Sequence, residues 1–130
     1  MNRYFQEVID AHLLIQRWLG DATSPLSICE ELLGRFSADY SMVTLSGHSL
    51  DFAALSHFFR SQRGAKQGLE IAIKQMTLVA ESEKGAVVSY QEQQQLGDQQ
   101  PTLRYSTVVF ELNTQGNVVW RHLHETAAAV

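Results

Sequence analysis

The sequence predicts an α+β fold in which N-terminal helices pack against one face of an antiparallel sheet. Residues 2–63 contain three segments whose apolar positions recur every three or four residues, the spacing of amphipathic helices. From Leu69 onward the pattern changes to four longer alternating segments separated by turn residues, which indicates a meander of strands. Helices can bury their apolar stripes only against one face of such a sheet.

The composition favours one globular domain spanning residues 1–130. The chain is 45% hydrophobic and 18% charged, and its net charge of −4 is spread without a cluster of lysines and arginines. We therefore expect no nucleic-acid partner, because non-specific binding needs clustered positive charge. A single cysteine, Cys29, leaves no internal disulfide and no cysteine-based metal site.

The beginning of the sequence does not have the pattern of a signal peptide, because Glu7 and Asp10 interrupt its apolar run. No stretch approaches the roughly 18 consecutive apolar residues that a membrane-spanning helix needs. We therefore expect a cytoplasmic protein with no membrane partner.

The first predicted helix covers residues 2–20 and ends at Gly20. His12 lies in the middle of its apolar stripe, where water is scarce. Two interpretations are open for this side chain. It is either a core histidine that hydrogen-bonds a carbonyl group or a polar group that faces a cavity.

Two further helices are predicted from their start signals. Ser24 is expected to cap the second helix, with Pro25 at its first position. Asp51 is expected to cap the third, over residues 52–63. Between these two helices, residues 39–50 read as two short strands joined by a turn at Ser46–Gly47. Long strands are then predicted at residues 69–80, 86–96, 102–112 and 117–126.

The last of these strands suggests a cavity wall. Strict alternation places Val118, Trp120, His122 and His124 on one face and Val119, Arg121, Leu123 and Glu125 on the other. A large aromatic residue followed by two histidines on one face is more than a plain core strand needs. We expect Trp120 to be buried and the two histidines to line the polar part of a pocket.

Pairing the strands across their turns gives four rows of neighbouring residues. The expected rows are Val88–Phe110–Trp120, Tyr90–Val108–His122, Glu92–Ser106–His124 and Gln94–Arg104–Thr126. Polarity rises from row to row, as in a pocket that is apolar inside and wet at its mouth. The opposite face mixes Leu103, Tyr105, Thr107, Val109, Val119 and Leu123 with polar residues, and we expect it to form a symmetric homodimer.

The polar residues of these rows allow several kinds of chemistry. His122 and His124 with Glu92 could ligate a metal, but such a pair is common by chance, so we expect no metal and no cofactor. A Ser–His–acid triad is rejected because Ser106 would lie between the other two residues. An acid–base pocket remains, in which a histidine or Glu92 is the base.

Two residues could complete an acid–base pocket. Tyr90 could donate a hydrogen bond to a developing oxyanion, and Arg104 could hold an anionic group or pair with a carboxylate. Asp39 either faces the pocket as a base or has a turn or capping role. A satisfied polar network at the end of the sheet is the alternative to all of these assignments.

Three segments carry a resemblance to a known superfamily. They are F-S-A-D-Y-S-M-V-T-L-S-G-H-S-L at residues 36–50, the helix D-F-A-A-L-S-H-F-F that follows, and the closing V-V-W-R-H-L-H-E-T. With them the chain resembles the nuclear transport factor 2-like (SnoaL-like, cystatin-type fold) superfamily, and in particular its small bacterial members of unknown function.

The resemblance implies a cone-shaped, curved sheet wrapped around the helices and one internal cavity, often in a homodimer. Relatives include ketosteroid isomerase, scytalone dehydratase, polyketide cyclases and non-catalytic binding modules. Asp39 and Tyr40 lie near the aspartate–tyrosine set of ketosteroid isomerase, but the last strand of this chain carries histidines instead.

Three functions are therefore expected in order. The first is binding of a small molecule in the cavity, by His12, Tyr40 and Trp120 among others. The second is an isomerase, dehydratase or cyclase. The third is a non-catalytic dimerisation or assembly module.

Overall fold

The computed structural model describes residues 1–129 and contains three helices and six strands within that range. The helices are α1 (Arg3–Gly20), α2 (Ser27–Leu33) and α3 (Phe52–Arg60). The strands are β1 (Phe36–Val43), β2 (Ser49–Asp51), β3 (Glu70–Ser82), β4 (Gly85–Gln95), β5 (Thr102–Leu112) and β6 (Val118–Ala127). The predicted α+β order of elements is confirmed.

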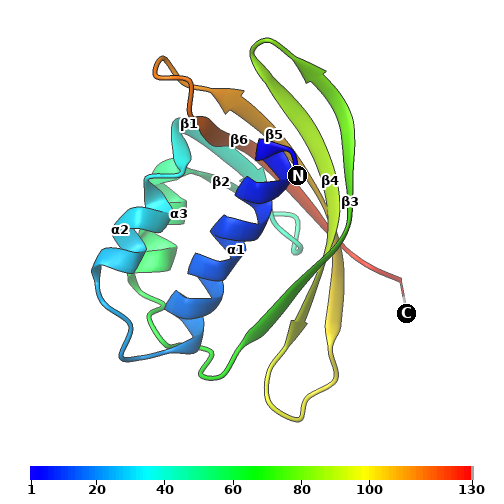
Figure 1. Ribbon diagram of the computed structural model, residues 1–130. Coiled ribbons are helices and arrows are strands. Elements are labelled where there is room, and N and C mark those ends of the chain that lie inside the picture. The colour runs from blue at the N-terminus through cyan, green and yellow to red at the C-terminus, as the bar shows by residue number, and fades with distance from the viewer. Residues whose placement is uncertain (130) are drawn as a thin grey trace.

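The six strands form one curved sheet in the order β2-β1-β6-β5-β4-β3. The meander from β3 to β6 is antiparallel throughout, as predicted. However, β1 runs parallel to β6, so the sheet is mixed rather than purely antiparallel. Figure 1 shows α1 lying in the concavity of the sheet, with α2 and α3 beside it.

Of the two helix caps predicted from the sequence, the one at Asp51 is confirmed. The side chain of Asn2 caps α1, and that of Asp51 caps α3 by accepting a hydrogen bond from the Ala54 amide. The prediction for α2 was wrong, because this helix begins at Ser27 without a side-chain cap. Ser24 is instead buried in the preceding turn, where its hydroxyl donates to the Asp21 carbonyl.

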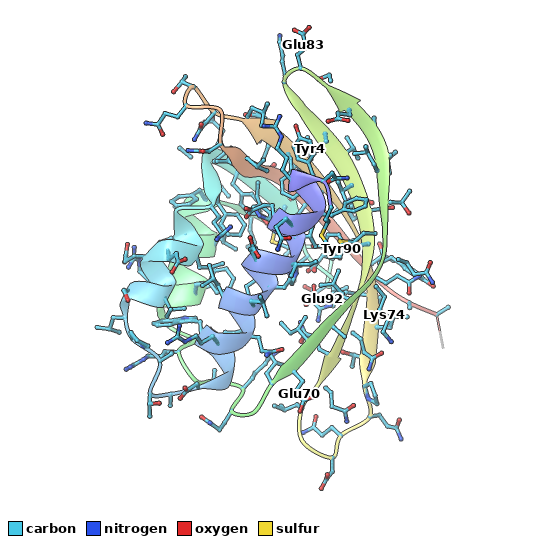
Figure 2. All side chains as sticks on the ribbon, in the orientation of Figure 1. Tyr4, Glu70, Lys74, Glu83, Tyr90 and Glu92 are labelled. Carbon is cyan, nitrogen blue, oxygen red and sulfur yellow. The ribbon has the colours of Figure 1, made fainter. Side chains whose placement is uncertain are left out.

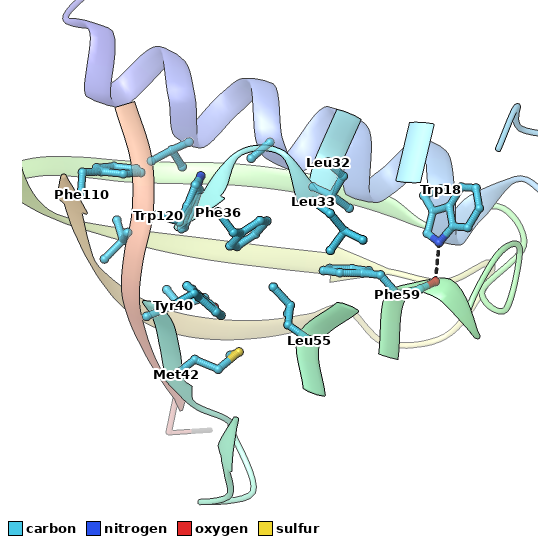
Figure 3. Close-up of a cluster of buried hydrophobic side chains, with 14 of the residues drawn as sticks. Trp18, Leu32, Leu33, Phe36, Tyr40, Met42, Leu55, Phe59, Phe110 and Trp120 are labelled. Carbon is cyan, nitrogen blue, oxygen red and sulfur yellow. Dashed lines mark hydrogen bonds between the residues drawn. The ribbon is translucent and has the colours of Figure 1, made fainter. Parts of the chain in front are cut away.

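The core lies between the helices and the concave face of the sheet. Figure 3 shows a row of buried side chains that runs from Phe110 and Trp120 through Phe36 and Leu55 to Phe59 and Trp18. The indole N–H of Trp18 donates to the Phe59 carbonyl over 2.7 Å and so ties α1 to α3. Trp120 is 2% exposed, which confirms its predicted burial.

A β-bulge at Arg121 reverses the side of the sheet to which each later side chain of β6 points. Trp120 pairs with Phe110 as predicted, but the next partner, Val109, pairs with His122, so Arg121 is an extra residue. An extra residue reverses the alternation beyond it. Trp120 and Leu123 are therefore both buried although they are three residues apart, which strict alternation forbids.

The predicted rows across β4 and β5 were also out of register. Val88 pairs with Val108 and Glu92 with Arg104, so these rows are displaced by two residues. Next to the turn between β4 and β5, Gln94 is opposite Thr102 and not opposite Arg104 as predicted. A shift of two residues keeps every side chain on its predicted face, so the inward placement of Glu92 survives the error.

Within residues 1–129, no helix combines the length and the apolar character that crossing a bilayer requires.

Candidate functional site

A pocket of about 120 Å³ lies between α1, α3 and the concave face of the sheet. Apolar side chains line most of it: Ile15, Phe36, Met42, Leu55, Phe59, Trp120 and Leu123. Its polar lining residues are His12, Tyr40, Glu92, Gln94, Arg104 and Glu125. Six elements contribute side chains to it, namely α1, α3, β1, β4, β5 and β6.

The deepest polar contact joins His12 on α1 to Glu92 on β4. His12 Nδ1 lies 2.7 Å from the Val8 carbonyl, and its Nε2 lies 3.1 Å from Glu92 Oε1. The carbonyl can only accept, so Nδ1 carries a proton. The contact at Nε2 then needs a second proton, because the nitrogen lone pair and a carboxylate would otherwise repel each other. A proton therefore lies between His12 Nε2 and Glu92 Oε1, and both side chains are almost fully buried.

The charge of Glu92 decides where this proton resides. Burial by itself lowers the pKa of His12, but the hydrogen bond and the negative charge of Glu92 outweigh it and raise that pKa above 6.5. Burial likewise raises the pKa of Glu92, but the hydrogen bond and charge of His12 lower it to about 2. Gln94 donates to the other carboxylate oxygen over 2.7 Å. The pair is thus an imidazolium and a carboxylate.

Two hydroxyl groups beside this pair lack partners. Within residues 1–129, the hydroxyls of Tyr90 and Ser106 are buried without a hydrogen bond of good geometry, although the two residues face each other on β4 and β5. The Tyr90 ring lies edge-on to His12, with ring centroids 5.4 Å apart. Figure 2 shows Tyr90 and Glu92 between α1 and the sheet. Buried polar groups are normally paired, so these hydroxyls mark unused hydrogen-bonding capacity next to the pocket.

A second charged pair lines the pocket on β5 and β6. Arg104 Nη1 lies 3.4 Å and 3.5 Å from the two carboxylate oxygens of Glu125. Burial raises the pKa of Glu125, and the positive charge of Arg104 only partly opposes this. On β1, burial and then the charge of Glu125 raise the pKa of Tyr40, so its phenol stays protonated at any ordinary pH.

The structure brings most of the predicted site residues together. His12, Tyr40, Glu92, Arg104 and Trp120 line the pocket. Tyr90 and Ser106 are buried beside it, on the same face of the sheet.

Three of the residues predicted to be catalytic lie elsewhere. The bulge at Arg121 turns His122 and His124 to the convex face, so their predicted place in the cavity was wrong. The imidazole of His122 lies 2.7 Å from the Ser41 hydroxyl, and His124 is exposed. Asp39 is exposed too, and its carbonyl accepts a hydrogen bond from Arg121.

Sequence reasoning missed Glu125, which was assigned to the outer face. Because the bulge reverses the alternation, Leu123 and Glu125 take the inward positions predicted for the two histidines. The pattern held one clue, since an inward Leu123 fits a core strand better than an outward one. Within residues 1–129, no group of three or more potential metal-binding side chains comes together.

Solved structures provide the comparison that decides the family. An NTF2-like protein of unknown function from Pseudomonas aeruginosa is 38% identical, with 97% of this chain and 98% of that chain covered and a TM-score of 0.90. The chain belongs to the nuclear transport factor 2-like family. Neither a protein-family model nor a curated protein matches the sequence.

More distant members of this fold share its shape alone. A putative scytalone dehydratase from Novosphingobium aromaticivorans is 11% identical, covers 97% of this chain and 82% of its own, and has a TM-score of 0.71. A putative ketosteroid isomerase from Parabacteroides distasonis is 10% identical, with 93% and 85% covered and a TM-score of 0.68. The NTF2-like fold thus includes proteins named for isomerase and dehydratase activities.

Proposed function

We propose that this NTF2-like protein binds one small molecule in the pocket between its helices and the concave face of its sheet. The observation that carries the proposal is the division of the pocket into an apolar wall and a polar end. Sites for small molecules are typically apolar concavities with a few convergent polar groups. Trp120 and Phe36 belong to the wall, and Tyr40, Arg104 and Glu125 belong to the polar end.

The volume of the pocket limits the size of the ligand. At about 120 Å³ it is slightly smaller than an engineered protein cavity of about 150 Å³ that binds benzene. The ligand is therefore a molecule of about one ring with a polar substituent. Larger compounds would enter only if α3 or its side chains moved.

A thermal-shift titration with single-ring compounds tests the proposal. A ligand at about 100 times its dissociation constant stabilises a protein by about 2.7 kcal/mol, which raises the melting temperature by several degrees. Leu55→Trp should fill the pocket and abolish this shift. Leu45→Trp, on an exposed turn, is the matched control and should preserve it. Equal shifts in both variants would place the ligand outside the pocket.

A second candidate function is acid–base catalysis of the isomerase, dehydratase or cyclase kind. Glu125 favours it, because a carboxylate with a raised pKa beside an apolar wall can remove a proton from bound substrate. The test is deuterium exchange at the carbon next to the carbonyl of cyclohexanone, followed by NMR in heavy water. Exchange should be catalysed by the wild type and lost in Glu125→Gln. An unchanged exchange rate in that variant contradicts the role.

We further propose a homodimer through the convex face of the sheet. Tyr105 is 49% exposed on β5, and Val109, four residues further along the same face, is half-buried. The supporting argument is that an exposed aromatic residue beside aliphatic ones is typical of subunit contacts. Sedimentation at micromolar concentration should give a dimer, and Tyr105→Glu should give a monomer. A wild-type monomer would contradict this proposal and leave the pocket unaffected.

A further inference from the structure

Arg104 is weakly engaged for a half-buried guanidinium. Its side chain is 18% exposed, and its contacts with Glu125 measure 3.4 Å and 3.5 Å. Strong hydrogen bonds between a guanidinium and a carboxylate measure about 2.7–2.9 Å and come in parallel pairs. Both contacts here use the same nitrogen, Nη1, and the other N–H groups have no partner within residues 1–129. Arg104 thus has donors to spare at the polar end of the pocket.

The second carboxylate in the pocket does not compete for these donors. Glu92 is opposite Arg104 on the neighbouring strand, but its oxygens contact His12 and Gln94, and within residues 1–129 no hydrogen bond joins it to Arg104. The imidazolium of His12 also balances its charge. The unused capacity of the polar end is therefore that of a cation with free N–H groups, and it suits an acceptor with negative charge.

We propose that the ligand of this pocket is a carboxylate of single-ring size, whose carboxylate group accepts hydrogen bonds from Arg104. The proposal rests on the pocket being the binding site. The ring would lie against Phe36, Phe59 and Trp120, which line the apolar wall. A carboxylate matches the planar fork of a guanidinium, whereas an ammonium group would be repelled by it.

Glu125 takes up a proton when the ligand enters. Two carboxylates at one guanidinium in a partly dry site repel each other, so one of them becomes neutral. The charged and titratable groups that act on Glu125 are Arg104, Glu92 and His12, with Tyr40 nearby on β1. Burial already raises the pKa of Glu125, so it gains the proton more readily than the ligand does.

Isothermal titration calorimetry with benzoate, benzyl alcohol and benzylamine tests the proposal. Benzoate should bind at least about tenfold more tightly than benzyl alcohol, as one hydrogen bond to a charged group would give. Benzylamine should bind more weakly than either. Titrations near pH 7 in buffers of different ionisation enthalpy should show uptake of up to about one proton per benzoate and none with benzyl alcohol.

Variants on both sides of the ion pair separate the contributions. Arg104→Gln should remove the preference for benzoate and still bind benzyl alcohol, and Arg104→Lys should keep part of the preference. Glu125→Gln should bind benzoate at least as tightly as the wild type but without proton uptake. Melting curves of the unliganded variants establish that each one is folded.

The outcomes distinguish this inference from the proposed function. If benzyl alcohol or benzylamine binds as tightly as benzoate, the carboxylate assignment is overturned while the pocket stands. The same holds if Arg104→Gln and Arg104→Lys both keep the full preference. If no probe binds, or if Leu55→Trp does not weaken binding, the pocket itself is not the site and both proposals fail.

Discussion

Replacing His12 with leucine is expected to destabilise the protein strongly, because it leaves Glu92 buried without its counterion. Glu92 is 3% exposed and His12 is 6% exposed, so water reaches neither of them freely. Removing one partner of a buried ion pair typically costs about 3–5 kcal/mol. The lowered pKa of Glu92 agrees in direction, because the hydrogen bond and positive charge of His12 outweigh the burial that would raise it.

Urea unfolding followed by the fluorescence of the two tryptophans measures this cost. His12→Leu should lower the free energy of unfolding by about 3–5 kcal/mol at pH 6. The double variant His12→Leu/Glu92→Leu should recover most of it, because an apolar pair of similar size replaces the ion pair. His57→Leu, at an exposed histidine on α3, is the control and should stay within about 0.5 kcal/mol of the wild type. A cost below about 1 kcal/mol for His12→Leu would refute the buried ion pair.

The pH dependence of wild-type stability follows from the same two groups. The lowered pKa of Glu92 contributes stability above pH 4.5, which is lost as the pH falls towards about 2. The raised pKa of His12 contributes stability that is complete below pH 6.5 and is lost as the pH rises through its folded value. The contribution of the pair is therefore greatest between roughly pH 4.5 and 6.5. Stability that rises steadily from pH 6 to pH 9 would contradict this assignment.

Three further predictions concern the sheet. Trp120→Ala should cost about 3–5 kcal/mol in urea melts, and a loss below about 1 kcal/mol would contradict its burial. Leu123→Glu should leave no cooperative transition in circular-dichroism melts, because it places a charge in the core. Tyr105→Glu changes an exposed side chain, so this variant should still be folded and show a cooperative transition. Gly85→Ala should lower the melting temperature, because the alanine Cβ would lie 2.0 Å from the Phe110 carbonyl oxygen on β5. An unchanged melting temperature would contradict this close approach.

Local pattern was sufficient for most of the elements and their order. The apolar spacing of α1 and the cap at Asp51 depend on residues that are neighbours in sequence, so both could be predicted. The inward placement of Glu92 and the burial of Trp120 followed from alternation along a single strand. The increase in polarity along one face of the sheet was also expected from alternation, but the two histidines assigned to its polar end lie on the other face.

The composition of the polar end was decided only by the tertiary structure. Trp120 is held inward by Glu7 on α1, whose carboxylate accepts its indole N–H over 3.1 Å, and Leu123 is held inward opposite Val108 on β5. Only an extra residue between them satisfies both contacts, and the bulge at Arg121 provides it. The parallel pairing of β6 with β1 is likewise made between segments about eighty residues apart. Alternation along one strand contains no information about such distant partners, and for this reason the sequence placed two histidines where the folded protein has Leu123 and Glu125.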